Sequence, residues 1–291
     1  MDVGQRSDRI DGRSTDESRR CHVSELVRTF DRADDAAAPP GTSTPETSTT
    51  LNTADRAVLI TGANRGIGRA LVEEALSRGV KRVYAGTRNP VAHSDPRVTP
   101  LILDVTSADE IQRAADQVES LDLLINNAGV ALYDDLSDPS VLEQHLDVNL
   151  FGVHRMIQAF APLLTRSGGA IVNNLSVNAL APLPVIPAYS VSKAAAFNLT
   201  QSLRVLLAAQ GVRVHAVLLG PVDTDMTRGL DIPKASPESV AHNIFDGVER
   251  DEAEIFPDSF SESLAESWSG GAAKVLERQY AALLEAVGSG S

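Results

Sequence analysis

The chain contains little that would suit a secreted or membrane-spanning protein. Its 291 residues include a single cysteine, Cys21, so no internal disulfide can form, and this composition fits a reducing compartment. No uninterrupted apolar stretch is long enough to cross a bilayer, and no apolar segment typical of a secretory signal follows the first residues. We therefore expect a cytoplasmic protein.

Basic residues are also scarce relative to acidic ones. Lys and Arg together number 26 against 39 Asp and Glu, which gives a formal net charge of −13. Such a balance argues against a surface that binds nucleic acid or an anionic membrane. His145, His154, His215 and His242 are scattered without metal-ligand spacing, so the sequence predicts no metal site. We therefore expect the binding partner to be a small molecule.

The chain divides by composition into two parts. Residues 1–54 are rich in Asp, Arg, Ser, Thr, Ala and Pro, and we expect a disordered N-terminal extension or linker there. Residues 55–291 are expected to form a single domain.

Apolar runs and helical periods alternate along this second part. Strands are expected at about 57–61, 82–86, 98–103, 121–126, 169–175, 212–219 and, very short, 253–256. Helices are expected at about 66–79, 107–119, 139–165, 187–209 and 236–250. The alternation, with strands that are almost continuously apolar, predicts an α/β fold with a doubly wound parallel sheet of the Rossmann type, covered by helices on both faces.

Tyr189 and Lys193 are four residues apart in an expected helix, so they lie on the same face. An adjacent ammonium favours the phenolate and would lower the pKa of the phenol. Such a pair can exchange a proton with an oxygen whose carbon exchanges a hydride. The same spacing also arises by chance on amphipathic helices, so other segments must support this interpretation.

A glycine turn lies between the first expected strand and the first expected helix. Gly62, Gly66 and Gly68 are spaced Gly-x-x-x-Gly-x-Gly, which lets backbone N–H groups and a helix N-terminus approach a pyrophosphate. An ordinary glycine turn is the alternative. Polar or small residues end three further strand runs, at Asp104-Val105, at Asn126 to Gly129 and at Ser176. Since ligands of open parallel sheets bind beyond the carboxyl ends of the strands, these groups are expected to face one crevice.

With these motifs in order, the chain resembles the short-chain dehydrogenase/reductase family from about Arg56 to the region of Pro257. The resemblance implies that Tyr189 is the general acid/base and that Ser176 donates a hydrogen bond to the carbonyl oxygen. It implies that Lys193 lowers the pKa of Tyr189 and binds the nicotinamide ribose, and that Asn149 anchors a water that links Lys193 to solvent. The alternative for Asn149 is an ordinary helix residue that caps the helix or faces solvent. The residues it places at the cofactor are Gly62, Asn64, Arg65, Gly66, Ile67, Gly68, Arg88, Asp104, Val105, Asn127, Ala128, Gly129, Tyr189, Lys193, Pro221, Val222 and Thr224.

The residues after the second expected strand predict which dinucleotide binds. A carboxylate there would accept hydrogen bonds from a ribose 2′-hydroxyl, but Thr87 and Arg88 follow the strand instead. Arg88 can bind a 2′-phosphate, and Arg65 in the glycine turn would add a second guanidinium. NADP(H) is therefore the expected cofactor. The alternative is that Arg65 and Arg88 are solvated surface charges that do not bind a phosphate.

These features predict an NADP(H)-dependent oxidoreductase that interconverts a ketone or aldehyde with its alcohol. The apolar, proline-rich stretch 180–187 between Ser176 and Tyr189 favours an apolar substrate. A reductase of carrier-bound 3-oxoacyl groups and a non-catalytic NADP(H)-sensing regulator remain alternatives. Because members of the family often pair through the helix that carries the tyrosine, the resemblance also implies a homodimer or homotetramer.

Overall fold

The computed structural model describes residues 52–288, with side chains up to residue 282. The sheet and all the described helical segments before Ala272 belong to one compact part, Ser48–Gly271. Helix α9 (Ala272–Gly288) belongs to a second part and is a separate amphipathic helix. The expected extension lies outside the described residues except for its last three. Among these, Thr53 is buried and its hydroxyl donates to Glu249 Oε1.

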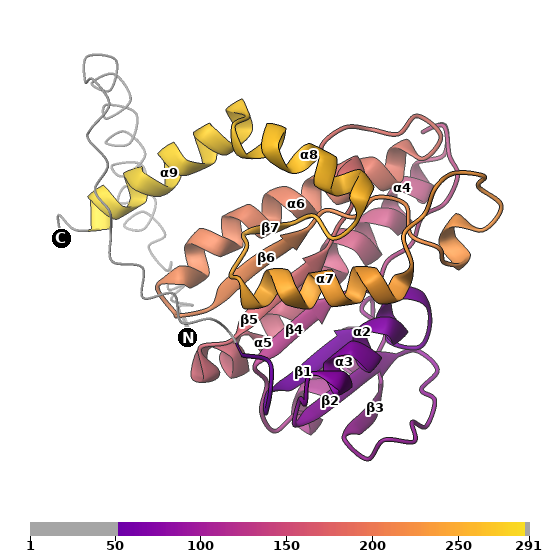
Figure 1. Ribbon diagram of the computed structural model, residues 1–291, viewed down its shortest axis with the longest axis vertical. Helices are drawn as coiled ribbons and strands as arrows, with labels where there is room; N and C mark the ends of the chain where they lie inside the picture. The colour runs from indigo at the N-terminus through magenta and orange to yellow at the C-terminus, as the bar shows by residue number, and fades with distance from the viewer. Residues whose placement is uncertain (1–51, 289–291) are drawn as a thin grey trace, which may run out of the picture. The chain divides into compact units, whose positions relative to one another are not determined.

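Seven parallel strands form a single sheet in the order β3-β2-β1-β4-β5-β6-β7 (Figure 1). The strands are β1 (Ala57–Thr61), β2 (Arg82–Thr87), β3 (Val98–Ile102), β4 (Leu123–Asn126), β5 (Ala170–Asn174), β6 (Arg213–Val217) and β7 (Glu254–Ile255). All six pairings are parallel, and the strand order reverses between β1 and β4. The predicted doubly wound α/β fold is therefore confirmed.

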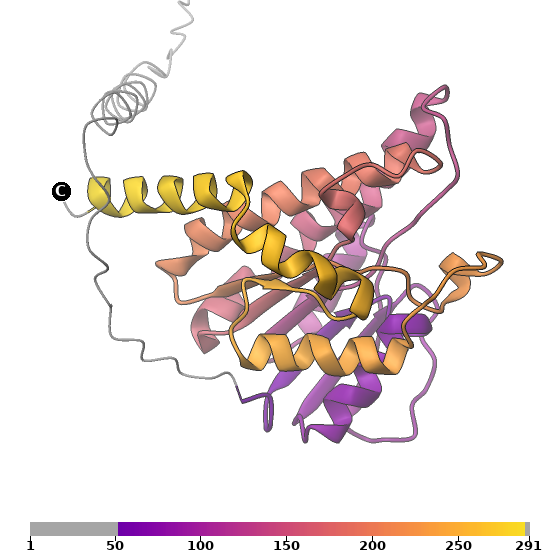
Figure 2. The same cartoon turned by 45° about the horizontal axis from the view of Figure 1, so that its top comes forward.

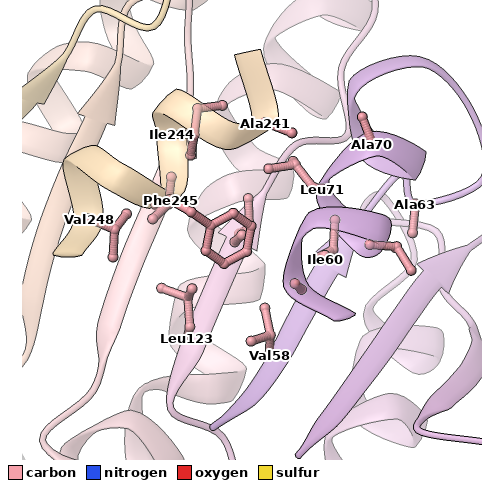
Figure 3. Packing of buried hydrophobic residues seen from close by; sticks show 14 of the residues in the cluster. Val58, Ile60, Ala63, Ala70, Leu71, Leu123, Ala241, Ile244, Phe245 and Val248 are labelled. Atoms are coloured by element: carbon pink, nitrogen blue, oxygen red, sulfur yellow. The ribbon is translucent and has the colours of Figure 1, made fainter. Parts of the chain in front are cut away.

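Helices α2 (Gly66–Ser77) and α7 (Pro237–Glu249) cover one face of the sheet. In the turned view of Figure 2, α7 lies across the near face of the sheet. Figure 3 shows Phe245 and Ile244 of α7 beside Leu71 of α2, above Ile60 and Leu123 of the strands. All five side chains are fully buried, so this cluster closes the core on that face.

The opposite face is covered by α3 (Ala108–Gln117), α5 (Val153–Ser167) and α6 (Pro187–Ala208). Met156 and Phe160 of α5 are fully buried there, and Leu203 of α6 packs in the same cluster. Because both faces are covered, the strands have apolar residues on both sides, which accounts for their continuous apolar runs.

Three helical features differ from the sequence prediction. The expected helix 139–165 is divided into α4 (Pro139–Leu146), a π-helical segment η2 (Asp147–Gly152) and α5. Helix α8 (Ser259–Ser269) and α9 were not expected, because the Ser- and Glu-rich stretch after β7 has no clear apolar period. In α8 the start is set by Asp258, whose side chain accepts from the Ser261 N–H while Ser261 Oγ bonds back to the Asp258 N–H.

Short 3₁₀ turns follow β5 and β6, namely η3 (Val177–Ala179) and η4 (Asp225–Thr227). Within residues 52–288, no helix is both long and apolar enough to cross a membrane. The same residues contain no group of three or more His, Cys, Asp or Glu side chains that could hold a metal ion.

Candidate active site

The glycine turn lies at the point where the strand order reverses. It follows β1, and Asn127 to Gly129 follow the neighbouring strand β4. Gly62 and Gly66 have φ of +67° and +49°, a region in which a side chain is strained. A Cβ on Gly68 would lie 2.0 Å from the carbonyl oxygen of Gly62, so the turn accepts only glycine at that position. This is the crevice in which doubly wound sheets bind dinucleotides.

Asn127 ties the loop after β4 to the glycine turn. Its Nδ2 donates to the carbonyl oxygens of Thr61 at 3.0 Å and Gly62 at 3.3 Å. Thr61 Oγ1 accepts from the backbone N–H groups of Asn127 and Ala128, each at 3.0 Å. The two predicted cofactor segments are therefore held together before any ligand contributes.

The start of α2 has the character of an anion site. The helix begins at Gly66 without a side-chain cap, and no acidic residue lies in its first turn. Uncapped N–H groups and the positive end of the helix dipole favour a phosphate. Of the other predicted residues in this turn, Asn64 is exposed and Ile67 packs partly into the core.

The loop after β6 lies against the same turn. A Cβ on Gly66 would lie 3.2 Å from Cγ2 of Thr224, so the Thr224 side chain packs directly on the backbone of Gly66. Val222 is buried and pairs with Ala235 in an isolated bridge, which anchors the loop that begins at Pro221. The loop therefore lies beside the glycine turn, and its contacts with a cofactor stay a prediction.

Ser176, Tyr189 and Lys193 come together at the ends of β5 and α6. All three are buried, with exposed fractions of 8%, 8% and 6%. Lys193 Nζ lies 5.6 Å from the centroid of the Tyr189 ring and donates to the carbonyl oxygen of Asn174 at 2.8 Å. The Ser176 Oγ accepts from the Asn178 N–H at 3.1 Å, makes a long 3.4 Å contact with the Leu219 carbonyl, and lies within hydrogen-bonding reach of the Tyr189 hydroxyl. The two hydroxyls can therefore face the same substrate oxygen.

Burial controls the protonation of this group. It raises the pKa of Tyr189 to about 12, although a hydrogen bond with Ser176 acts in the opposite direction. Burial lowers the pKa of Lys193 to about 8. The lowering of the Tyr189 pKa that the sequence predicts from Lys193 is thus not the dominant effect in the protein alone. Tyr189 holds its proton at neutral pH, which is the state required to protonate an oxygen.

Asn149 lies in the π-helical segment η2, and its side chain connects the loop after β4 to helix α6. Its Oδ1 accepts from the Val130 N–H, and its Nδ2 donates to the Val130 carbonyl and to Ser192 Oγ, each at 2.9 Å. Ser192 Oγ in turn donates to the carbonyl of Tyr189 at 2.7 Å. The side-chain amide therefore holds the loop after β4 against α6. Both hydrogens of Nδ2 are used, so a water at Asn149 would donate to its backbone carbonyl or to the second lone pair of Oδ1. π-Helical turns are frequent at functional sites.

Two residues beside this group were not predicted as site residues. His145 is fully buried, and its ring meets that of Tyr189 edge to face with 6.2 Å between centroids. Its Nε2 accepts from the Leu132 N–H at 3.0 Å, so Nδ1 carries the proton that it shares with the Val141 carbonyl at 2.7 Å. Only the position of His145 one turn before Asn149 could have drawn attention to it. The second residue is Asn174, whose Nδ2 donates to Asn127 Oδ1 at 2.9 Å.

The two arginines expected at the 2′-phosphate have different partners. Arg88 lies near Asp104 at the ends of β2 and β3. Burial raises the pKa of Asp104, but hydrogen bonds from Thr106, together with the charge of Arg88, outweigh this and lower it. Arg65 is mostly exposed and forms an ion pair with Asp225 of the loop after β6, with 3.4 Å between Nη1 and Oδ2. The predicted Val105 is buried against Gly152, where a Cβ would come within 2.8 Å of it.

Buried oxygens without hydrogen-bond partners lie at the carboxyl ends of three strands. Thr87 Oγ1, Asn126 Oδ1 and Asn174 Oδ1 end strands β2, β4 and β5, and none has a hydrogen-bond partner in the described part of the chain. Buried polar atoms are nearly always paired, so such atoms indicate a place where a ligand supplies the partner. Together with the glycine turn and the uncapped helix start, they fit a bound dinucleotide.

Comparison with known proteins agrees with this geometry. A family model described as short chain dehydrogenase matches residues 56–234. An uncharacterized oxidoreductase of Staphylococcus epidermidis is 32% identical over 206 residues, covering 67% of this chain and 89% of that protein.

Two solved structures are also similar. A short chain dehydrogenase from Burkholderia cenocepacia in complex with NADP is 34% identical with a TM-score of 0.73, and the match covers 79% of this chain and 98% of that one. The NADPH-bound carbonyl reductase from chicken fatty liver is 25% identical with a TM-score of 0.64, over 70% and 100% of the two chains.

Proposed function

The chain belongs to the short-chain dehydrogenase family, and from this premise we propose that it is an NADP(H)-dependent oxidoreductase that interconverts a ketone or aldehyde with its alcohol. The observation that carries the proposal is the meeting of Ser176, Tyr189 and Lys193 beside the glycine turn. A fold alone does not determine chemistry, but this set of side chains has a use only where a proton is exchanged.

The chain's own groups can manage the charge that develops on a carbonyl oxygen. The nicotinamide, when bound, supplies the hydride. The Ser176 hydroxyl lies beside that of Tyr189 and can donate to the oxygen, and Tyr189 holds the proton that the oxygen needs. Lys193, 5.6 Å from the phenol ring, stabilises the phenolate after the proton has left. In the direction of alcohol oxidation the same phenolate accepts the proton.

Three observations support NADP(H) over NAD(H). No carboxylate ends β2, and Arg88 follows it beside Asp104. Thr87 offers a buried hydroxyl without a partner at the same strand end. The Burkholderia and chicken proteins, which this chain resembles, were crystallised with NADP and NADPH. Arg65 would have to leave its exposed ion pair with Asp225 to reach a phosphate, which costs little because such pairs are weak.

Exposed apolar side chains favour an apolar substrate. They gather on the loops that follow β4, β5 and β6 and at the start of α8, and they are Leu132, Tyr133, Leu136, Leu183, Val185, Met226, Leu230, Ile232 and Phe260. The first two loops are joined, because Asp134 accepts from the Ala188 N–H at 3.3 Å. Phe260 lies against Gly220 of the third loop, where a Cβ would come within 3.0 Å of it. Exposed apolar side chains on three loops that follow the carboxyl ends of the strands suit an apolar carbonyl compound.

The alternatives are less well supported. A carrier-bound 3-oxoacyl substrate would need a basic docking surface, whereas the chain has a net charge of −13. A cofactor-sensing regulator would not need Ser176, Tyr189 and Lys193, the side chains that exchange a proton. A homodimer or homotetramer and a cytoplasmic location stay predictions, the first of which light scattering on the purified protein would test.

The test is NADPH oxidation, followed by absorbance, against aldehydes and ketones of increasing size, with NADH as the comparison. If apolar contacts select the substrate, kcat/KM should rise by about fourfold per added methylene until the apolar side chains are covered. Tyr189→Phe should lose about 10²- to 10⁴-fold in kcat and keep its affinity for NADPH. Tight NADPH binding without turnover of any compound would favour the sensing regulator.

A further inference from the structure

Asn174, the last residue of β5, has an amide oxygen that no described residue binds. The side chain is only 6% exposed, and its Oδ1 has no hydrogen-bond partner. A buried acceptor without a partner is unfavourable and uncommon in folded proteins. The other polar groups of the residue are used, since Nδ2 binds Asn127 and the backbone carbonyl binds Lys193.

The orientation of this amide follows from its neighbours. Asn127 directs its Nδ2 at two carbonyl oxygens, those of Thr61 and Gly62, so its Oδ1 must face Asn174. Only the Nδ2 of Asn174 can donate to that oxygen, which it does at 2.9 Å. A flipped amide would bring two oxygens together. The Oδ1 of Asn174 is therefore turned away from Asn127 and remains available.

The missing partner must be a hydrogen-bond donor. The phosphates of a dinucleotide are acceptors only, so they do not suit this oxygen. The donors are the ribose hydroxyls and the amino groups of the carboxamide and the adenine. Lys193 Nζ binds the carbonyl of Asn174 itself at 2.8 Å. Oδ1 thus belongs to the residue that directly contacts Lys193, the side chain expected at the nicotinamide ribose.

We propose that Asn174 is a cofactor-positioning residue whose Oδ1 accepts a hydrogen bond from a hydroxyl of the nicotinamide ribose. The proposal rests on the proposed NADP(H)-dependent function. One residue would then connect three parts of the site, because its carbonyl holds Lys193, its Nδ2 holds the loop after β4, and its Oδ1 orients the ribose that carries the nicotinamide.

Ligands of different length test this assignment by calorimetric titration of the cofactor-free protein. NADPH contains both the ribose and the nicotinamide, 2′-phospho-ADP-ribose keeps the ribose without the nicotinamide, and 2′,5′-ADP ends before either. Asn174→Leu removes the acceptor with little change in volume. We expect it to weaken binding of the first two ligands by about 5- to 10-fold and to leave 2′,5′-ADP within about twofold.

The possible results separate the explanations. Equal weakening of all three ligands would mean that Asn174 acts only through Asn127 and the glycine turn, which would overturn the proposal. Weakening of NADPH alone would assign the donor to the carboxamide and would also overturn it. If the wild-type protein bound neither NADPH nor 2′,5′-ADP, the proposed cofactor itself would be wrong.

Two further variants control for folding. Thr200→Val removes the hydrogen bond that Asn173 makes at 3.0 Å on the opposite face of the same strand, and it should leave the affinity for all ligands unchanged. Asn174→Gln keeps both the amide donor and the amide acceptor, so it should bind NADPH more tightly than Asn174→Leu. If it bound NADPH no better than the leucine variant, the acceptor role would be refuted.

Discussion

Replacing Lys193 by methionine should stabilise the cofactor-free protein and abolish its activity. Burial lowers the pKa of Lys193 from 10.5 to about 8, and among the described residues no carboxylate forms an ion pair with it. Holding the ammonium in the fold therefore costs about 3 kcal/mol at pH 7. Methionine avoids this cost and loses one charge-assisted hydrogen bond to the Asn174 carbonyl, which is worth about 2 kcal/mol. The net gain of about 1 kcal/mol would raise Tm by about 2–4 °C.

The stability difference between the wild-type protein and the methionine variant should depend on pH. Because the folded-state pKa lies below the unfolded one, the folded protein releases the lysine proton first as the pH rises from about 8 to 10.5. The wild-type protein then gains stability relative to the methionine variant, which has no such proton. The difference between the two should be largest below pH 8 and should shrink steadily toward pH 10.5.

Urea unfolding of both proteins at several pH values between 7 and 10, in the absence of cofactor, measures this difference. Titrations shared by the two proteins cancel in the comparison. A methionine variant that is less stable than the wild type at pH 7 would refute the reasoning. So would a stability difference that does not change with pH, since it would show that burial of the charge is not its source.

Three other changes have definite expected results. Arg88→Asp should shift cofactor preference toward NAD(H), because it puts a carboxylate where a 2′-phosphate is expected; an unchanged ratio of kcat/KM with NADPH and NADH would contradict the assignment. Gly68→Ala should abolish cofactor binding or folding, because its Cβ would lie 2.0 Å from the Gly62 carbonyl; circular dichroism and titration with 2′,5′-ADP distinguish the two, and normal binding would argue against the turn geometry. Phe245→Ala should cost about 3–5 kcal/mol in urea unfolding, because it opens a cavity between α7 and the sheet, whereas a cost below about 1 kcal/mol would mean that the cluster repacks.

Much of the fold was predictable because its signals are local. Continuous apolar runs predicted all seven strands, with errors of one or two residues at most ends. Helical periods predicted α2, α3, α6 and α7 in the same way. The interruption of the expected helix 139–165 was not predictable, because Asp147 to Gly152 contain no proline and an isolated glycine is tolerated inside a helix. Contacts distant in sequence accompany it, since Gly152 packs on Val105 and Arg155 binds the carbonyl of Val105.

Which residues come together follows from chain order and residue type alone. A parallel sheet with right-handed crossovers brings the ends of β1, β4 and β5 together, so the glycine turn, Asn127 and Ser176 had to share one edge. The position of Tyr189 one helical turn before Lys193 added the proton-exchanging pair. These conclusions need only chain order, periodicity and residue type.

The hydrogen-bond partners and pKa values of these residues depend on the packing of the folded chain. It placed His145 against the ring of Tyr189, paired Arg65 with Asp225, and left the Oδ1 of Asn174 without a partner. It also made burial the dominant influence on the pKa of Tyr189. Desolvation and hydrogen-bond pairing depend on every atom that surrounds a group, and most of those atoms come from segments far away in the sequence. A local pattern can name the members of a site, but their charges and partners exist only once the chain is packed.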